Sequence, residues 1–283
     1  MKLSAPAKVN LHLRVLHRRE DGFHDLETLM VPLTLADDIT VAISIGRTVK
    51  VTCDQADVPL GDDNLATRAA QLFSRATGQQ FGAEIGITKR IPMGAGLGGG
   101  SSDAAAVLIA LDALFKARLG PEGLENLAAQ LGSDVAFFIR NTPAWCRGRG
   151  ELITPFAMPE PLSLLLVRPP FGVETPWAYQ RWAGSQSVAP ELEAEQTLGW
   201  VSIVNSLERP VFEKYLLLPT LKKWLLAQPE TRVAAMSGSG STMFAVLKDQ
   251  ADGPALEKRV RAVFGESLWT TLCQTTETRQ AGA

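Results

Sequence analysis

Hydrophobic and polar residues alternate strictly from Lys8 to Val15, and this period of two predicts a β-strand. The polar side of that strand carries Lys8, Asn10, His12 and Arg14. A charged segment with the turn signal Asp21-Gly22 follows, after which residues 26–35 are again mostly apolar. The chain therefore begins with a strand that has one fully polar face and continues into a polar loop.

The pattern along the rest of the chain predicts alternating strands and helices. Strands are expected at 39–45, 48–53, 83–90 and 162–168, helices at 64–77, 104–116, 121–131, 200–208, 212–227 and 254–264, and a strand-loop-strand unit at 233–247. Pro155, Pro159 and Pro161 mark a boundary between two domains, residues 1–157 and residues 158–283. The sequence therefore predicts a mixed α/β protein of two domains.

Composition and charge restrict the possible partners. The 283 residues are 46% hydrophobic and 20% charged, which is ordinary for a globular protein with a sizeable core. The formal charge of −2 produces no general field that would attract nucleic acid or an acidic membrane, so an anionic ligand must be held locally. No apolar run approaches the roughly 18 residues that a membrane helix needs, and no apolar segment of a signal peptide follows Met1.

Cys53, Cys146 and Cys273 are odd in number and far apart, which fits neither a disulfide framework nor a zinc site. The sequence therefore predicts a protein of the reducing cytoplasm. His12, His17 and His24 lie close together in the sequence, but we expect no structural zinc there, and no metal site is assigned to side chains.

A glycine-rich segment precedes the predicted helix at 104–116. It consists of Pro92, Met93, Gly94, Ala95, Gly96, Leu97, Gly98, Gly99, Gly100, Ser101 and Ser102. A dinucleotide-binding fold would require a second strand after that helix, and a P-loop would end in Gly-Lys-Ser/Thr, so neither motif fits. Glycines allow successive N–H groups to converge on an anion, and the start of the helix adds its dipole. We expect a phosphate cradle without a lysine.

Two further features of the sequence leave alternatives open. Ser101 and Ser102 could cap the helix, or one hydroxyl could reach a phosphate or Mg²⁺, and both roles can hold together. A second glycine-rich segment, Ser237, Gly238, Ser239, Gly240 and Ser241, lies between apolar stretches and by itself indicates only a hairpin connection. Beside the first segment, it predicts a second anion-binding loop.

These motifs resemble those of the GHMP superfamily of small-molecule kinases. The matching segments are Pro6-Ala7-Lys8-Val9-Asn10, Gly94 to Ala104, Leu131-Gly132-Ser133-Asp134-Val135 and Met236 to Thr242. The segment Arg18-Arg19-Glu20-Asp21-Gly22-Phe23-His24 is typical of the branch that acts on 4-diphosphocytidyl-2-C-methyl-D-erythritol, and the similarity covers nearly the whole chain.

The resemblance implies a two-domain α/β fold with mixed sheets and an active-site cleft between the domains. It also implies ATP as co-substrate on the first glycine loop, Mg²⁺ with the ATP, and phosphoryl transfer to a hydroxyl of the cytidine diphosphate substrate. By this similarity Asp134 is the general base and Lys8 the cation beside it. From the residues alone, Asp134 would be a turn or cap residue and Lys8 a solvated lysine.

The resemblance also assigns the substrate contacts. It implies that Phe23 and His24 receive the cytosine, by stacking and by hydrogen bonds, that Tyr179 is a second stacking ring, and that Asn10 contacts the substrate. The second loop, Ser237, Gly238, Ser239 and Gly240, is expected to bind the same substrate. Relatives usually have Tyr at the position of Phe23 and often Asp at the position of Ser206, so the roles of these two residues are open.

Two other functions compete with this hypothesis. The first is a kinase of the same fold that acts on another small alcohol, such as mevalonate or homoserine, which would have no use for a cytosine pocket. The second is a non-catalytic nucleotide-binding protein, which would not need Lys8 and Asp134 together. We expect no nucleic acid or membrane partner, and a monomer or weak homodimer.

Overall fold

The computed structural model describes residues 1–186, 192 and 195–276. The chain folds into two compact units. Unit 1 consists of Met1–Ala7, Leu35–Met93 and Gly98–Thr142, and unit 2 of Lys8–Thr34, Gly94–Leu97 and Pro143–Ala283. The units interleave along the chain, so neither coincides with residues 1–157 or 158–283, and that boundary stays a prediction.

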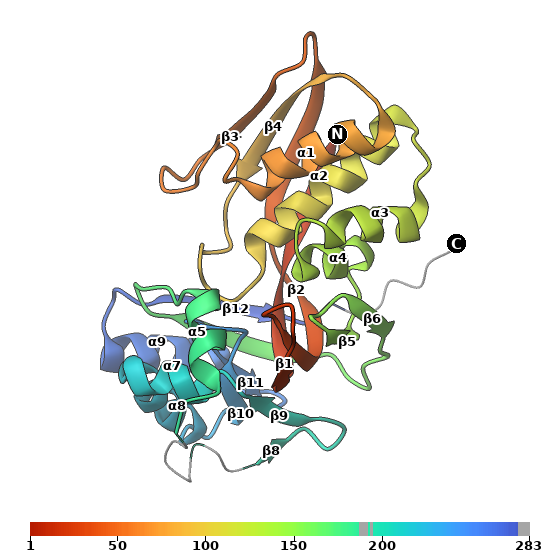
Figure 1. The fold of residues 1–283 in the computed structure, drawn as a ribbon. Helices are drawn as coiled ribbons and strands as arrows, with labels where there is room; N and C mark the ends of the chain where they lie inside the picture. The colour runs from red at the N-terminus through yellow and green to blue at the C-terminus, as the bar shows by residue number, and fades with distance from the viewer. Residues whose placement is uncertain (187–191, 193–194, 277–283) are drawn as a thin grey trace. The chain divides into compact units, whose positions relative to one another are not determined.

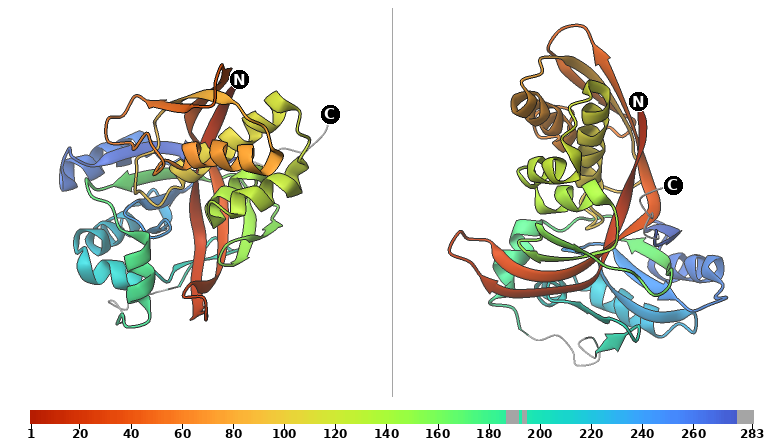
Figure 2. Two further views of the ribbon diagram at one scale, coloured as in Figure 1. Left: turned by 45° about the horizontal axis from the view of Figure 1, so that its top comes forward. Right: turned by 90° about the vertical axis from the view of Figure 1, so that its right-hand side faces the viewer.

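The two longest strands contribute to both units. Strand β1 (Lys2–Arg18) and strand β2 (His24–Ser44) lie side by side in both views of Figure 2. In unit 1, β2 pairs antiparallel with β4 (Gly82–Thr88), and β4 pairs parallel with β3 (Val49–Cys53). The alternating pattern predicted at 8–15 is thus confirmed as the centre of a longer strand.

Four helices pack together in unit 1 (Figure 1). They are α1 (Leu65–Thr77), α2 (Gly99–Phe115), α3 (Gly120–Ala129) and α4 (Ser133–Arg140). Asn64 caps α1, because its side chain accepts a hydrogen bond of 2.8 Å from the N–H of Ala66. The structure confirms the first three helices, except that α2 begins five residues before the predicted start at residue 104. The sequence pattern did not predict α4.

Unit 2 contains four further short strands, β5 (Ala144–Gly148), β6 (Leu152–Pro155), β8 (Gln196–Thr197) and β9 (Ser202–Asn205). Strand β5 pairs with β2 and β6, and β9 pairs with β1 and β8. Strand β9 pairs parallel with β1, with His12 opposite Val204 and Leu13 opposite Asn205. The helix predicted at 200–208 is therefore wrong except at residue 208, because residues 202–205 pair with a strand 192 residues away and this pairing overrides the local pattern.

A second sheet in unit 2 has the order β10-β11-β7-β12. Its strands are β7 (Ser163–Arg168), β10 (Thr231–Met236), β11 (Met243–Leu247) and β12 (Trp269–Gln274). The helices of this unit include α5 (Thr175–Trp182), α7 (Glu208–Lys214), α8 (Leu217–Leu226) and α9 (Gly253–Phe264). The single helix predicted at 212–227 is two helices, α7 and α8, separated at Tyr215 and Leu216. The structure confirms the strand-loop-strand unit at 233–247.

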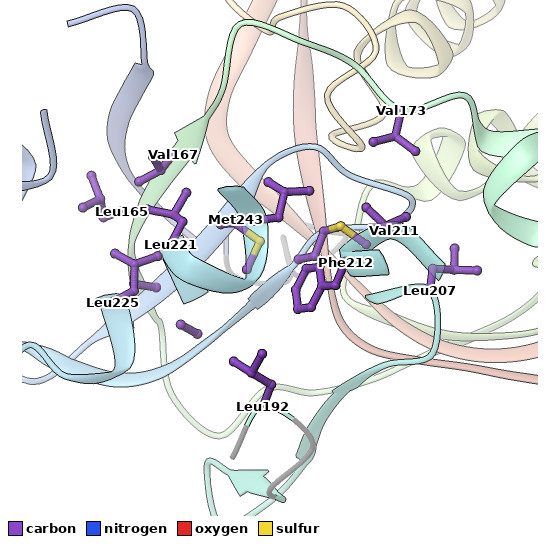
Figure 3. Packing of buried hydrophobic residues seen from close by; sticks show 14 of the residues in the cluster. Leu165, Val167, Val173, Leu192, Leu207, Val211, Phe212, Leu221, Leu225 and Met243 are labelled. Atoms are coloured by element: carbon purple, nitrogen blue, oxygen red, sulfur yellow. The ribbon is translucent and has the colours of Figure 1, made fainter. Parts of the chain in front are cut away.

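The core of unit 2 lies between the helices and this sheet. Leu221 and Leu225 of α8 and Phe212 of α7 lie beside Leu165 of β7 and Met243 of β11 (Figure 3). Each of these five side chains is buried, and burying a side chain of this size contributes about 1.5–3 kcal/mol. The same cluster includes Met236 at the end of β10, so both ends of the loop between β10 and β11 are anchored in the core. In the described residues, none of the helices has the length and apolar character required to span a membrane.

Candidate active site

The first glycine loop turns its carbonyl groups toward the rest of unit 2. The oxygens of three consecutive residues accept hydrogen bonds: Ala95 from the N–H of Thr242 (3.2 Å), Gly96 from the Oγ of Ser237 (3.0 Å) and Leu97 from the N–H of Lys8 (2.9 Å). Because a planar trans peptide directs its N–H opposite to its C=O, the N–H group that follows each of these carbonyls points away from the donor that binds the carbonyl. This is the arrangement expected of an anion-binding nest.

The loop continues into the first turn of α2 in unit 1. Gly98 has a φ of 73° and forms the N-cap without a side-chain hydrogen bond, and α2 begins at Gly99. Neither Ser101 nor Ser102 caps the helix, because both lie inside its first turn. The hydroxyl of Ser102 is buried and has no hydrogen-bond partner among the described residues. Pro92 and Met93, also in unit 1, lead into the loop.

A buried charge cluster lies beside this helix start in unit 1. The ammonium group of Lys89 contacts the carboxylates of Asp37 and, at 2.9 Å, of Asp103. Asp37 also accepts hydrogen bonds from the N–H groups of Arg90 (2.6 Å) and Ile91 (2.8 Å). The cluster therefore ties together β2, the segment before the glycine loop and, through Asp103, the N-terminal half of α2. Our reading of the sequence missed it.

Burial dominates the electrostatics of this cluster. Desolvation, with a smaller contribution from the negative charge of Asp37, raises the pKa of Asp103 to about 7, although Lys89 opposes this shift. Desolvation lowers the pKa of Lys89, but the charges and hydrogen bonds of Asp103 and Asp37 outweigh it, so the pKa rises. The lysine thus stays charged near neutral pH, while Asp103 titrates there.

The second glycine loop connects β10 to β11 and approaches the polar face of β1. A Cβ on Gly238 would lie 3.4 Å from both the Nζ of Lys8 and the Oδ1 of Asn10. The structure therefore brings together, within unit 2, Lys8, Asn10, the loop residues Ser237 to Gly240 and the first part of the other glycine loop. Their convergence supports the predicted second nest.

The polar face of β1 is ordered by a chain of hydrogen bonds. The Nζ of Lys8 donates to the Oδ1 of Asn10 (2.7 Å), and the Nδ2 of Asn10 donates to the Oγ1 of Thr28 (2.8 Å). Thr28 in turn donates to the carbonyl of His12 (2.6 Å). This chain fixes the orientation of the Asn10 amide. Our reading of the sequence did not single out Thr28, although it is a polar residue in an otherwise largely apolar stretch.

The predicted base-binding residues also lie in unit 2. The His24 ring is 5.7 Å from the Tyr179 ring and 5.9 Å from the Trp182 ring, measured between centroids. Phe23 is exposed, and the guanidinium carbon of Arg149 lies 4.9 Å from its ring centroid. Burial, and to a lesser degree the charge of Arg18, lowers the pKa of His24, so this imidazole is neutral near pH 7. Trp182 and Arg149 were not predicted.

Asp134 lies in the first turn of α4, in unit 1. Gly132 is the N-cap residue, so a carboxylate at this position interacts favourably with the helix dipole. From the residues alone Asp134 would be a turn or cap residue, whereas it lies inside the helix, two positions after the N-cap. Lys8 lies in unit 2, and its pairing with Asp134 stays a prediction.

Comparisons with known proteins give consistent matches. The model for the N-terminal domain of GHMP kinases matches residues 64–142, and the model for their C-terminal domain matches residues 187–266. A 4-diphosphocytidyl-2-C-methyl-D-erythritol kinase from Methylacidiphilum infernorum is 43% identical over 282 residues, which covers 96% of both chains. The enzyme of that name from Geobacter metallireducens is 39% identical and covers 90% of this chain and 92% of its own.

Solved structures agree with these relatives. A crystal structure of 4-(cytidine 5′-diphospho)-2C-methyl-D-erythritol kinase has a TM-score of 0.76 and 37% identity, and covers 96% of this chain and 99% of its own. A homoserine kinase from Cytophaga hutchinsonii has a TM-score of 0.70 at 19% identity, covering 99% and 95%, which shows a shared fold. This chain belongs to the GHMP kinase family and, within it, to the group of 4-diphosphocytidyl-2-C-methyl-D-erythritol kinases.

Proposed function

We propose that this chain transfers the γ-phosphoryl group of ATP to the 2-hydroxyl of 4-diphosphocytidyl-2-C-methyl-D-erythritol. The products are the 2-phosphate and ADP, and the reaction belongs to the non-mevalonate pathway to isoprenoid precursors. The observation that carries the proposal is the convergence in unit 2 of two glycine loops on Lys8 and Asn10. The same unit holds His24 beside two aromatic rings.

Some residues of the proposed site bind the two substrates, and others take part in phosphoryl transfer. The N–H groups of the first loop bind the phosphates of ATP, and the second loop binds the diphosphate of the substrate. Phe23 stacks on the cytosine, and the neutral imidazole of His24 forms hydrogen bonds with the base edge. Asn10, held by Thr28, contacts the substrate from β1.

Phosphoryl transfer requires mainly positioning and charge stabilisation. Asp134 accepts the proton of the attacking hydroxyl, and the ammonium group of Lys8 stabilises negative charge on the transferring group. Lys8 is only 4% exposed, so its charge acts in surroundings of low dielectric constant, where an electrostatic interaction is stronger than in water.

The residues at the start of α2 fit the Mg²⁺ that accompanies ATP. Such an ion needs only one or two protein oxygens in addition to the phosphates and water, and the buried hydroxyl of Ser102 has no partner among the described residues. We propose Ser102 as the residue that holds the ion, which would neutralise phosphate charge. A monomeric or weakly dimeric state and a cytoplasmic location stay predictions.

The test is an assay of ADP release by the purified protein with ATP, Mg²⁺ and the cytidine diphosphate substrate. Mevalonate and homoserine serve as control alcohols, and CDP serves as a competitor. We expect turnover with the cytidine substrate alone and inhibition by CDP. Turnover with a control alcohol, without inhibition by CDP, would instead identify another kinase of this fold. Nucleotide binding without ADP release from any alcohol would identify a binding protein.

A further inference from the structure

The loop between β10 and β11 has to be shaped by groups outside itself. Ser237, Ser239, Ser241 and Thr242 are each at most 6% exposed, and Gly238 and Gly240 have φ values of 56° and 88°. A buried segment outside the sheet needs hydrogen-bond partners for its backbone. The residues that supply those partners therefore determine which backbone groups of the loop remain for a ligand.

Asn205, the last residue of β9, binds two carbonyl groups at the start of this loop. Its Nδ2 donates to the oxygens of Met236 and Gly238, both at 2.7 Å. Its Oδ1 accepts from the N–H of Leu207 at 2.9 Å, so the orientation of the amide is fixed. The side chain is only 4% exposed. A donor that spans residues 236 and 238 determines the bend of the backbone between them.

Glu208, the first residue of α7, binds the same segment through the N–H of Met236. Its Oε1 accepts from the N–H of Met236 at 2.8 Å, and its Oε2 accepts from the Nζ of Lys222 in α8 at 2.6 Å. Lys222 also donates to the carbonyl of Leu192 at 2.9 Å. The two charged residues are 6% and 3% exposed.

A buried ion pair of this kind adds little net stability, because desolvation of both charges offsets their attraction. Breaking it by removing one partner is costly, since the remaining charge is then unpaired. The pair is therefore better explained by the positions of the groups that it holds than by a contribution to the stability of the fold. Lys222 holds the carboxylate of Glu208 in place, and the carboxylate holds the N–H of Met236.

The anchored loop in turn contacts the rest of the site in unit 2. Ser237 donates to the carbonyl of Gly96, and the hydroxyls of Ser239 and Thr175 lie 2.8 Å apart. The Cα of Gly238 faces Lys8 and Asn10, as the 3.4 Å spacing of a Cβ built on it shows. Among the described residues, the N–H groups of Gly238 and Ser239 form no hydrogen bond.

We propose that Asn205 and Glu208, with Lys222 behind Glu208, are positioning residues that hold the N–H groups of Gly238 and Ser239 toward the diphosphate of the substrate. This inference rests on the proposed function, in which the loop binds that diphosphate. The Oγ of Ser206 accepts from the N–H of Val15 at 3.1 Å, so this side chain is not part of the anchor.

The first experiment measures the dissociation constant for CDP by calorimetry, and the KM values for the cytidine substrate and ATP, in the wild type and in Asn205→Asp. The substitution keeps the shape and the acceptor for Leu207. It places a carboxylate oxygen against the carbonyls of Met236 and Gly238 in place of a donor. We expect the CDP dissociation constant and the KM for the cytidine substrate to rise about tenfold or more. Ser206→Ala is the control beside it and should leave both values unchanged.

The second experiment separates positioning from stability with two double variants. Both double variants remove the buried charges. The first, Glu208→Gln/Lys222→Met, keeps an acceptor for the N–H of Met236, and the second, Glu208→Leu/Lys222→Met, does not. We expect CDP affinity within about threefold of wild type in the first and at least about tenfold weaker in the second. The melting temperature of each double variant is also measured. If Glu208 and Lys222 only stabilise the fold, CDP affinity should follow the melting temperature and not the presence of the acceptor at residue 208.

The outcomes distinguish this inference from the proposed function. The positioning role would be overturned, and the proposed function left intact, if CDP bound with equal affinity to the wild type, to Asn205→Asp and to both double variants. The positioning role would also be overturned if CDP affinity followed the melting temperature of each variant, whether or not residue 208 offers an acceptor to the N–H of Met236. A wild-type protein that does not bind CDP would overturn the proposed function, and the inference with it.

Discussion

Replacement of Gly96 by alanine tests whether close contact between the two glycine loops is required for activity. Gly96 has a φ of 75°, which costs an L-residue about 1–2 kcal/mol. An added Cβ would overlap the carbonyl oxygen of Ser237 and lie 3.0 Å from that of Gly240, so one of the loops must move. Overpacking of this kind costs about 1–3 kcal/mol more. We expect the free energy of unfolding to fall by about 2–5 kcal/mol.

The expected effect on activity is larger than the effect on stability. A displacement of about 1 Å in a positioning group can reduce the rate about 100-fold, so kcat/KM for the cytidine substrate should fall by at least that factor. Urea unfolding and steady-state kinetics measure the two effects. Gly78→Ala is the matched control, because Gly78 has a φ of 70° at the end of α1 and no atom lies within 4 Å of its added Cβ. It should show the backbone strain alone, with unchanged kinetics. Equal stability losses and near-normal turnover in both variants would refute the reasoning.

Three further predictions concern single side chains. Asp134→Asn should lower kcat about 10²- to 10⁴-fold with ATP binding retained, and near-normal turnover would remove Asp134 from the mechanism. Phe23→Ala should weaken CDP binding by about 1–3 kcal/mol in calorimetry, and unchanged affinity would show that the base binds elsewhere. Burial raises the pKa of Asp103 from 3.8 to about 7, so the folded state binds the extra proton and the free energy of unfolding falls as pH rises from about 4 to about 7. Asp103→Asn should lose this contribution in urea unfolding followed against pH, and parallel profiles of the two proteins would contradict it.

The local pattern of hydrophobic and polar residues predicted most of the helices and strands, and the wrong predictions have physical causes. The alanine run after residue 104 marks a helix, but α2 begins at Gly99, among glycines and serines of low helix propensity. That start is fixed by tertiary contacts: Asp103 pairs with Lys89, and a Cβ on Gly99 would be 3.0 Å from Ile91. Residues 202–205 resemble part of a helix but form a strand because they pair with β1.

The motif residues were predictable, and the residues that support them were not. The glycine loops, Lys8 and Asp134 each lie in a short continuous segment that resembles a motif of the family. Their supports are distant in sequence: Asp37 lies 52 residues from Lys89, and Asn205 lies 31 from Met236. No periodicity encodes such pairs. A usable signal would have been a polar residue predicted to be buried, such as Asp37 or Glu208, since such a residue requires a partner.

Anion binding by main-chain groups, which we propose for both glycine loops, places a requirement on the residues around each loop. A loop that offers its N–H groups to a phosphate cannot also use them to hold its own shape, as a helix or sheet does. Its carbonyls must then be bound by donors from elsewhere. In the second loop Asn205 binds the carbonyls of Met236 and Gly238, and in the first loop the N–H of Lys8 and the hydroxyl of Ser237 bind carbonyls. Under the proposed function, the donors buried behind the loops hold the loop carbonyls, and the amides in front of them are left for the ligand.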